Sequence, residues 1–114
     1  MPRQKSANRL RAKRIHDIVS NNPRRGLDHL SEIQDLLIDS DAGNRNLATL
    51  ALVRMSTQHQ ADLRELIPIL LSRLDDESSN VRVNSLTGLY NLGHWFPQEM
   101  MTASDLIVAS TVLE

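Results

Sequence analysis

Cysteine is absent from this 114-residue chain, and its aromatic residues are limited to one tyrosine, one tryptophan and one phenylalanine. Without cysteine, the chain has no disulfide framework and no thiolate metal site. The same absence fits a reducing compartment, so we expect a cytoplasmic protein. With so few rings, a stacking surface for single-stranded nucleic acid is not expected. A core would be built from aliphatic side chains.

Long apolar runs are also missing. None approaches the roughly 20 residues that a helix needs to cross a bilayer, so no membrane contact is expected. The basic N-terminus is not followed by the apolar core of a signal peptide, and no secretory signal is predicted. The length and an apolar content of 40% indicate one domain with a modest core.

Catalytic signatures are lacking. The sequence has no nucleophile elbow, no glycine-rich phosphate loop and no zinc-protease motif. The four histidines do not occur in pairs with metal-ligand spacing and a third ligand nearby; they are His16, His29, His59 and His94. We therefore predict a protein that is not an enzyme, with no catalytic residue, no metal and no cofactor.

Charge is divided unevenly along the chain. Residues 1–25 carry eight basic side chains and one acid, whereas residues 26–114 carry five arginines and thirteen acids. Such asymmetry indicates an acidic partner for the basic end; alternatively, the basic segment neutralises its own acidic body. If the partner is a nucleic acid, the phosphate contacts would be Arg3, Lys5, Arg9, Arg11, Lys13, Arg14, Arg24 and Arg25.

A repeat with a spacing of 37 residues runs through the chain. Similar residues recur at this spacing in the pairs Leu30 and Ile67, Ile33 and Leu70, Leu37 and Leu74, Asp39 and Asp76, Arg45 and Arg82, and Leu52 and Leu89. A period of this size with helical patterning inside it indicates stacked helix pairs, an α-solenoid.

Six segments have apolar residues at helical spacing and turn signals between them. The predicted helices are 4–20, 27–38, 44–57, 63–74, 81–93 and 98–113. Leu10 and Ile38 are placed on the core-facing stripes, and Leu86 is placed on the core-facing side of the fifth helix, opposite its polar residues. Asp62 and Asn80 are expected to cap helices, and Pro68 to bend one. Short connections predict antiparallel neighbours.

The second copy of the repeat resembles a HEAT repeat. It reads Leu63-Arg64-Glu65-Leu66-Ile67-Pro68-Ile69-Leu70-Leu71, then Leu74-Asp75-Asp76, then Val81-Arg82 and Ser85-Leu86. In that family, a first helix with a central proline is followed by an Asp-bearing loop and a second helix opening with Val-Arg. The first copy departs from this pattern, with Ser31 at the position of Pro68 and Asn44 at that of Val81.

The resemblance implies an all-α fold, a short right-handed HEAT-like superhelix of about six helices. It also implies that Asp39 bonds Arg45, and Asp76 bonds Arg82, across the turns, as structural pairs. The expected divisions are a basic helix and turn at 1–25, repeats at 26–60 and 61–97, and an incomplete third repeat at 98–114.

Function is predicted from the same resemblance. HEAT arrays bind proteins or nucleic acids on a curved surface, so we expect a non-enzymatic scaffold that binds a protein partner. The alternative is a nucleic-acid-associated protein that contacts phosphates through its basic N-terminal helix. The expected protein-partner surface consists of Leu47, Leu50, Arg54, Asn84, Thr87, Tyr90, Asn91 and His94. The alternative for the polar members is an ordinary solvated helix face.

The C-terminal end carries a further expectation. Residues 106–113 are largely apolar, whereas a terminal solenoid repeat normally has a polar outer face. We predict that this end is buried against a second copy of the chain or a partner subunit. The alternative is that it packs inward on the fifth helix.

Overall fold

The computed structural model describes the backbone of residues 2–58 and 61–101 and the side chains of residues 7–58 and 63–101. Within these residues the chain is helical and contains no strand, which confirms the predicted all-α class. The elements are α1 (Pro2–Asn21), the 3-10 helix η1 (Pro23–His29), α2 (Leu30–Leu37), α3 (Ala42–Met55), the 3-10 helix η2 (Ala61–Glu65), α4 (Leu66–Leu71) and α5 (Ser79–Trp95).

A further helical turn begins at residues 97–101. The predicted sixth helix, 98–113, lies mostly outside the described residues, and so does the apolar stretch 106–113.

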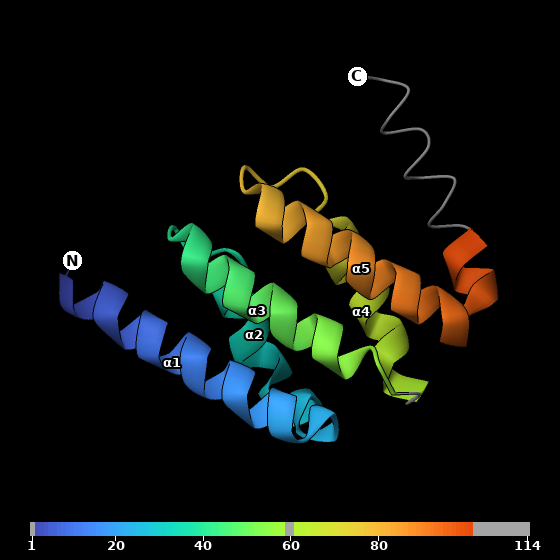
Figure 1. The fold of residues 1–114 in the computed structure, drawn as a ribbon, viewed down its shortest axis with the longest axis horizontal. Helices are drawn as coiled ribbons and strands as arrows, with labels where there is room; N and C mark the ends of the chain where they lie inside the picture. Colours follow the sequence, from blue (N-terminus) through green and yellow to red (C-terminus); the bar gives the residue numbers. More distant parts are fainter. Residues whose placement is uncertain (1, 59–60, 102–114) are drawn as a thin grey trace.

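The three long helices lie side by side, in the order α1, α3, α5, and the shorter α2 and α4 lie behind them (Figure 1). α3 packs against both α1 and α5, while α2 packs on α3 and α4 packs on α5. Residues 37 apart occupy equivalent places in successive long helices: Ile15, Leu52 and Leu89 are all buried. The sequence repeat is therefore also a repeat of packing.

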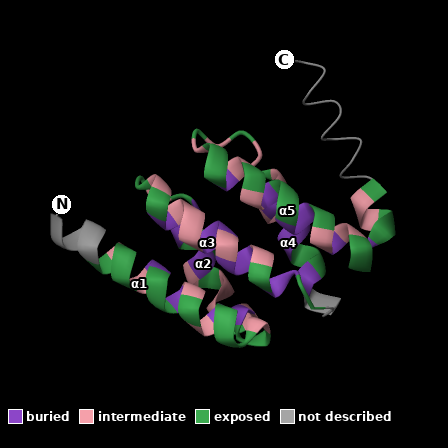
Figure 2. Ribbon diagram, viewed as in Figure 1, coloured by how far each residue is buried: buried purple, intermediate pink, exposed green. Residues whose placement is uncertain are grey.

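The core runs between these two sets of helices and is almost entirely aliphatic (Figure 2). α2 contributes Ile33, Leu36 and Leu37, and α4 contributes Leu66 and Leu70. Burying apolar surface at roughly 25 cal/mol per Å² is the main force that holds such helices together, since isolated helices this short are marginal in water.

Three residues expected to face the core are exposed, and one of them is Leu86, at 49%. Leu10 is 70% exposed because it lies off the buried stripe of α1, which Ala12, Ile15 and Val19 form. Ile38 is 73% exposed because α2 ends at Leu37, and the chain turns away before its side chain reaches the core.

Capping and bending also differ in detail from the sequence expectations. α5 begins at Ser79 with Ser78 as its N-cap, so Asn80 lies in the first turn and is not the cap. Both predicted first helices of the repeats are divided into a 3-10 turn and an α-helix. In the second repeat the 3-10 turn gives way to the α-helix about one turn before Pro68. Proline has no backbone N–H to donate to that turn, and its ring crowds it. The Asp62 side chain lies outside the described residues.

Gly88 brings α5 close to α4. A Cβ atom at this position would lie 2.8 Å from Leu70 Cδ1, and Leu70 is itself fully buried. The close approach of the two helices therefore depends on the missing side chain.

Gly88→Val is expected to lower the free energy of unfolding by about 1–3 kcal/mol, because the added methyl groups overpack the α4–α5 contact. Urea denaturation monitored by circular dichroism measures this. Thr87→Val is the matched control, since it adds a β-branched apolar residue at a neighbouring exposed position and should change stability by less than about 0.5 kcal/mol. Equal stability of the two variants would contradict the close-contact argument.

Candidate interaction surface

A largely buried ion pair joins the two repeats. Arg45 on α3 donates from Nε and Nη2 to the two carboxylate oxygens of Asp76, at 3.0 and 3.2 Å. The side chains are only 12% and 5% exposed. Its Nη1 donates to the main-chain oxygen of Asp39 at 2.8 Å and to that of Ser40 at 3.2 Å. Arg45 thus stabilises the turn that precedes α3 and also connects α3 to the next repeat.

The same arrangement recurs at the 37-residue spacing. Arg82 Nη1 donates to the main-chain oxygens of Asp76 and Glu77 at 2.6 and 3.1 Å. Asn8, 37 residues before Arg45, donates from Nδ2 to Asp39 Oδ1 at 2.9 Å. We call these contacts the ladder: Asn8 bonds Asp39, Arg45 bonds Asp76, and Arg82 bonds the main-chain oxygens of Asp76 and Glu77. Within the described residues, no carboxylate accepts from Arg82.

The ladder corrects the expected pairing of Asp39 with Arg45 and of Asp76 with Arg82. Arg45 and Arg82 each bind the main-chain oxygen of the aspartate in their own repeat, and Arg45 forms its ion pair with the aspartate of the following repeat. Sequence spacing alone does not distinguish a carbonyl from a carboxylate.

The ladder also sets the charge state of its aspartates. Burial is the largest influence on Asp76 and would raise its pKa, but the bonds from Arg45 and the Ser78 N–H, with the charge of Arg73, bring the pKa below the ordinary value. Asp39 follows the same pattern, its pKa being lowered by bonds from Asp41, Asn44 and Asn8 against the effect of burial. Both carboxylates are ionised at neutral pH, as a structural role requires.

Two amide side chains of the predicted partner surface form hydrogen bonds between helices. Asn84 Nδ2 donates to Asn46 Oδ1 at 2.7 Å, and Asn91 Nδ2 donates to Ser56 Oγ at 3.0 Å, so both amides connect α5 to α3. Thr87 is exposed, but its hydroxyl donates to the main-chain oxygen of Val83. The polar groups of Asn84, Thr87 and Asn91 therefore form hydrogen bonds within the protein.

The remaining predicted surface residues are more accessible. Leu47 and Leu50 on α3 are half-buried, and Arg54 is exposed without an ion pair in the described part of the chain. Tyr90 is 81% exposed, and the His94 side chain is also exposed.

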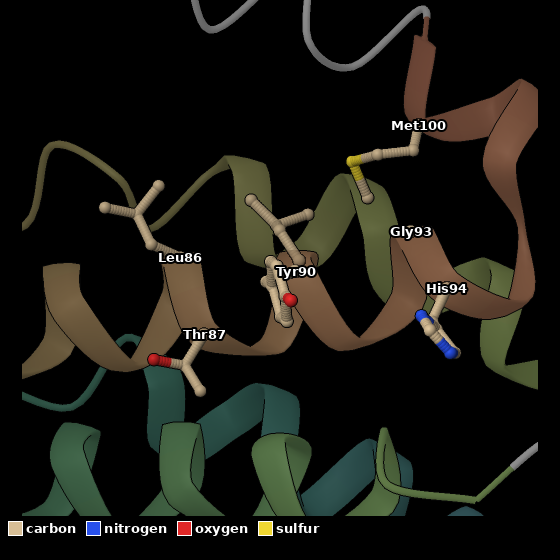
Figure 3. A pocket seen from close by; sticks show the side chains of 7 residues that line it. Leu86, Thr87, Tyr90, Gly93, His94 and Met100 are labelled. Atoms are coloured by element: carbon tan, nitrogen blue, oxygen red, sulfur yellow. The ribbon is translucent and has the colours of Figure 1, made fainter.

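Tyr90 and His94 separate two hollows. A groove of about 720 Å³ lies on the outer side of α5, where Figure 3 shows Leu86 and Met100 on the same open side. A smaller hollow of about 300 Å³ lies between the ends of α3 and α5 and is lined by Ser56, Thr57, Tyr90, Asn91, His94 and Trp95. Sequence reasoning missed the groove because Leu86 was assigned to the core.

The basic N-terminal segment is open to solvent. Arg9, Lys13, Arg24 and Arg25 are exposed and make no ion pair with another described residue. Arg14 lies 3.7 Å from Glu32. The half-buried Arg11 has an Nε without a hydrogen-bond partner. The side chains of Arg3 and Lys5 lie outside the described residues.

In the described residues, no group of three metal-ligating side chains is assembled, and no helix has the length and apolarity needed to cross a membrane. No family model, curated protein or solved structure matches the chain.

Proposed function

We propose that the chain is a short right-handed HEAT-like solenoid that acts as a non-enzymatic interaction module. The parallel series of α1, α3 and α5, backed by α2 and α4, supports this architecture, as does the ladder that repeats every 37 residues. A protein partner binds the curved surface formed by the long helices, centred on the second half of α5.

One observation carries this proposal: Tyr90 is 81% exposed and stands between the two hollows. Tyr and Trp dominate the binding energy of protein interfaces, because they bury a large area with few rotatable bonds. Two of the chain's three aromatic residues, Tyr90 and Trp95, line the smaller hollow together with His94. The Trp95 ring is fixed edge-on to His94 at 5.7 Å, and its Nε1 donates to the main-chain oxygen of Ser56.

Tyr90→Ala should weaken capture of the protein partner by at least about fivefold, because an interface tyrosine commonly contributes more than 1 kcal/mol. The measurement is affinity capture from lysate of the source organism, with nuclease added, followed by quantitative mass spectrometry and titration of the captured protein. Leu10→Ala, which truncates an exposed leucine on α1, should leave capture unchanged. If Tyr90→Ala and Leu10→Ala capture the partner equally well, Tyr90 is not part of the binding surface.

A second candidate function is phosphate binding by the basic segment, favoured by the four exposed cations without ion pairs: Arg9, Lys13, Arg24 and Arg25. Side chains of this kind neutralise phosphates without reading sequence, and the binding falls steeply as salt displaces them.

Replacing Arg9, Lys13, Arg24 and Arg25 by glutamine is expected to abolish retention of duplex DNA or RNA at about 50 mM salt while leaving the helical spectrum intact. Fluorescence anisotropy at several salt concentrations measures both the affinity and its salt slope. Arg54→Gln removes one exposed cation from α3 and is the control, with little change expected. If the unmodified protein binds neither nucleic acid at this salt concentration, the second function is excluded.

A further inference from the structure

Buried polar atoms without a hydrogen-bond partner gather where α1 meets the rest of the protein. Among the described residues these side-chain atoms are Arg11 Nε and His16 Nε2 on α1, and Asn44 Oδ1 on α3. Asn44 lies beside the α1 contact of the ladder, because its Nδ2 and that of Asn8 donate to the two carboxylate oxygens of Asp39. Each such atom costs free energy, and native structures contain few of them. This cost falls on one interface.

α1 also buries little apolar surface. Among its described side chains, the fully buried apolar residues are Ala12, Ile15 and Val19, and none is larger than isoleucine. α3, by contrast, fully buries Leu52 and Met55. The gain from burying one aliphatic side chain is of the same order as the cost of one unsatisfied buried group. α1 is therefore held to the protein by a smaller margin than α3.

The polar contacts of α1 are weaker than those of the next repeat. Asn8 is uncharged and makes one hydrogen bond to the first aspartate of the ladder. Its counterpart Arg45 makes two charge-assisted bonds to Asp76, and bonds of that kind are the stronger ones. Arg14 lies 3.7 Å from Glu32, but its side chain is 64% exposed, and such surface pairs contribute little. No strong ion pair among the described residues fastens α1.

The chain can bend between α1 and η1. α1 ends at Asn21, and Asn22 has an extended backbone, with φ −147° and ψ 95°. Pro23 follows, and a proline disfavours a helical backbone at the residue before it. η1 is fastened on the other side of this break, because Gly26 is buried and a Cβ atom there would collide with the side chain of Met55. α1 can therefore move as a unit while η1 stays in place.

α1 covers one side of α3. On α5, Asn84 and Asn91 lie on the side that faces α3, and the residues 37 positions earlier are Leu47 and Arg54. Because the packing repeats with the sequence, this side of α3 faces α1, in agreement with the order of the long helices in Figure 1. Leu47 and Leu50, which are three residues apart on α3, are both half-buried. Removing α1 would expose these leucines.

We propose that α1 is a detachable cover: it swings about Asn22 and Pro23 while α2 to α5 stay folded, and so exposes Leu47 and Leu50 of α3. The chain then has a closed form and an open form, which differ in the apolar surface they present. The device goes beyond the function proposed above, because it depends neither on Tyr90 nor on phosphate binding.

The absence of natural cysteine allows a matched pair of probes in the full chain. Ala12→Cys on α1 and Ala51→Cys on α3 are the same substitution, at positions that are 1% and 0% exposed. Under native conditions an excess of thiol reagent should label Ala12→Cys at least about tenfold faster, because local opening of α1 exposes only that position. Urea denaturation of each variant corrects for any difference in global stability.

A second set of variants tests the cause of the opening. In the Ala12→Cys protein, Arg11→Ala and His16→Val introduce the residue types that α3 has 37 positions later, and each removes an unsatisfied buried atom. Each should slow labelling by at least about threefold, since such atoms favour the open form, and neither should change the labelling of Ala51→Cys. Lys13→Ala is the control, because it removes an exposed cation of α1 and should leave the labelling rate unchanged.

Hydrogen exchange of the unmodified chain, followed by mass spectrometry, avoids any effect of the cysteines. The amides of residues 12–21 should exchange at least about tenfold faster than those of residues 46–55, because α1 opens without global unfolding. Two results would overturn the cover: exchange or labelling of α1 and α3 at the same rate, or faster labelling of α1 that neither Arg11→Ala nor His16→Val slows. Capture through Tyr90 is unaffected by either result.

Discussion

Asp76→Asn is expected to lower the free energy of unfolding at pH 7 by about 3 kcal/mol, because it leaves Arg45 largely buried without its carboxylate. The loss comes from breaking a bidentate pair, in which each oxygen accepts one N–H from the guanidinium, and from weakening the turn that begins α5. Urea denaturation of the full chain measures it.

The effect should depend on pH with a definite sign. The pKa of Asp76 is lower in the folded protein than its ordinary value near 3.8, so the folded state favours the ionised form. A lowered pKa contributes stability above the unfolded value, and the contribution is lost as pH falls through the folded value. The difference between the unmodified protein and Asp76→Asn should be constant from pH 7 to 5 and shrink below about pH 4.

A double-mutant cycle separates the ion pair from the other bonds of Asp76. Arg45→Met, Asp76→Asn and the two combined should give a coupling energy of about 1–3 kcal/mol, since the residues contact one another directly. Glu77→Gln changes an exposed acid next to Asp76 and is the control, with less than about 0.5 kcal/mol expected. A coupling energy near zero would show that the two side chains act independently.

Leu70→Ala should destabilise the protein by about 2–5 kcal/mol, the range found when a buried leucine is truncated and its cavity does not collapse. Leu70 is fully buried and packs against Gly88 of α5, which has no side chain to fill the space. Small domains commonly have about 5–15 kcal/mol of total stability, so this loss threatens folding at 37 °C.

Thermal and urea denaturation of Leu70→Ala should be compared with those of Leu10→Ala, which shortens an exposed leucine and should cost less than about 0.5 kcal/mol. Leu89→Ala removes a second buried leucine on the α5 side and should behave like Leu70→Ala. If the variants at residues 70 and 89 are as stable as the one at residue 10, the assigned core face is wrong.

The 37-residue period was sufficient to predict the helices of both repeats to within a few residues, because it combines helical spacing with turn signals. It also predicted the burial of Ile33, Leu70 and Leu89, which occupy the most regular positions. It failed for Leu10 and Ile38. The exposure of Ile38 depends on where α2 ends, and that of Leu10 on a small residue, Ala12, taking the buried position on α1. Ala12 forms part of the buried stripe of α1, but an alanine gives a weak hydrophobic signal.

The candidate surface was predicted less well than the fold. Asn84 and Asn91 look like solvent-facing amides in the sequence, yet each bonds a residue on α3 that lies 38 or 35 positions away. Such pairings depend on how two helices are rotated against each other, which periodicity does not determine. Leu86 was misplaced for the same reason, and its misplacement concealed the groove. Tyr90 and His94 were correctly selected as accessible.

The ladder allows the array to be extended by whole 37-residue units. Arg45 bonds a carboxylate that lies 31 residues later, and Asn8 bonds one at the same separation, so an internal duplication of one 37-residue unit supplies both a new donor and a new acceptor in register. A chain lengthened in this way should keep its hydrogen-bonded turns in register along the added repeat.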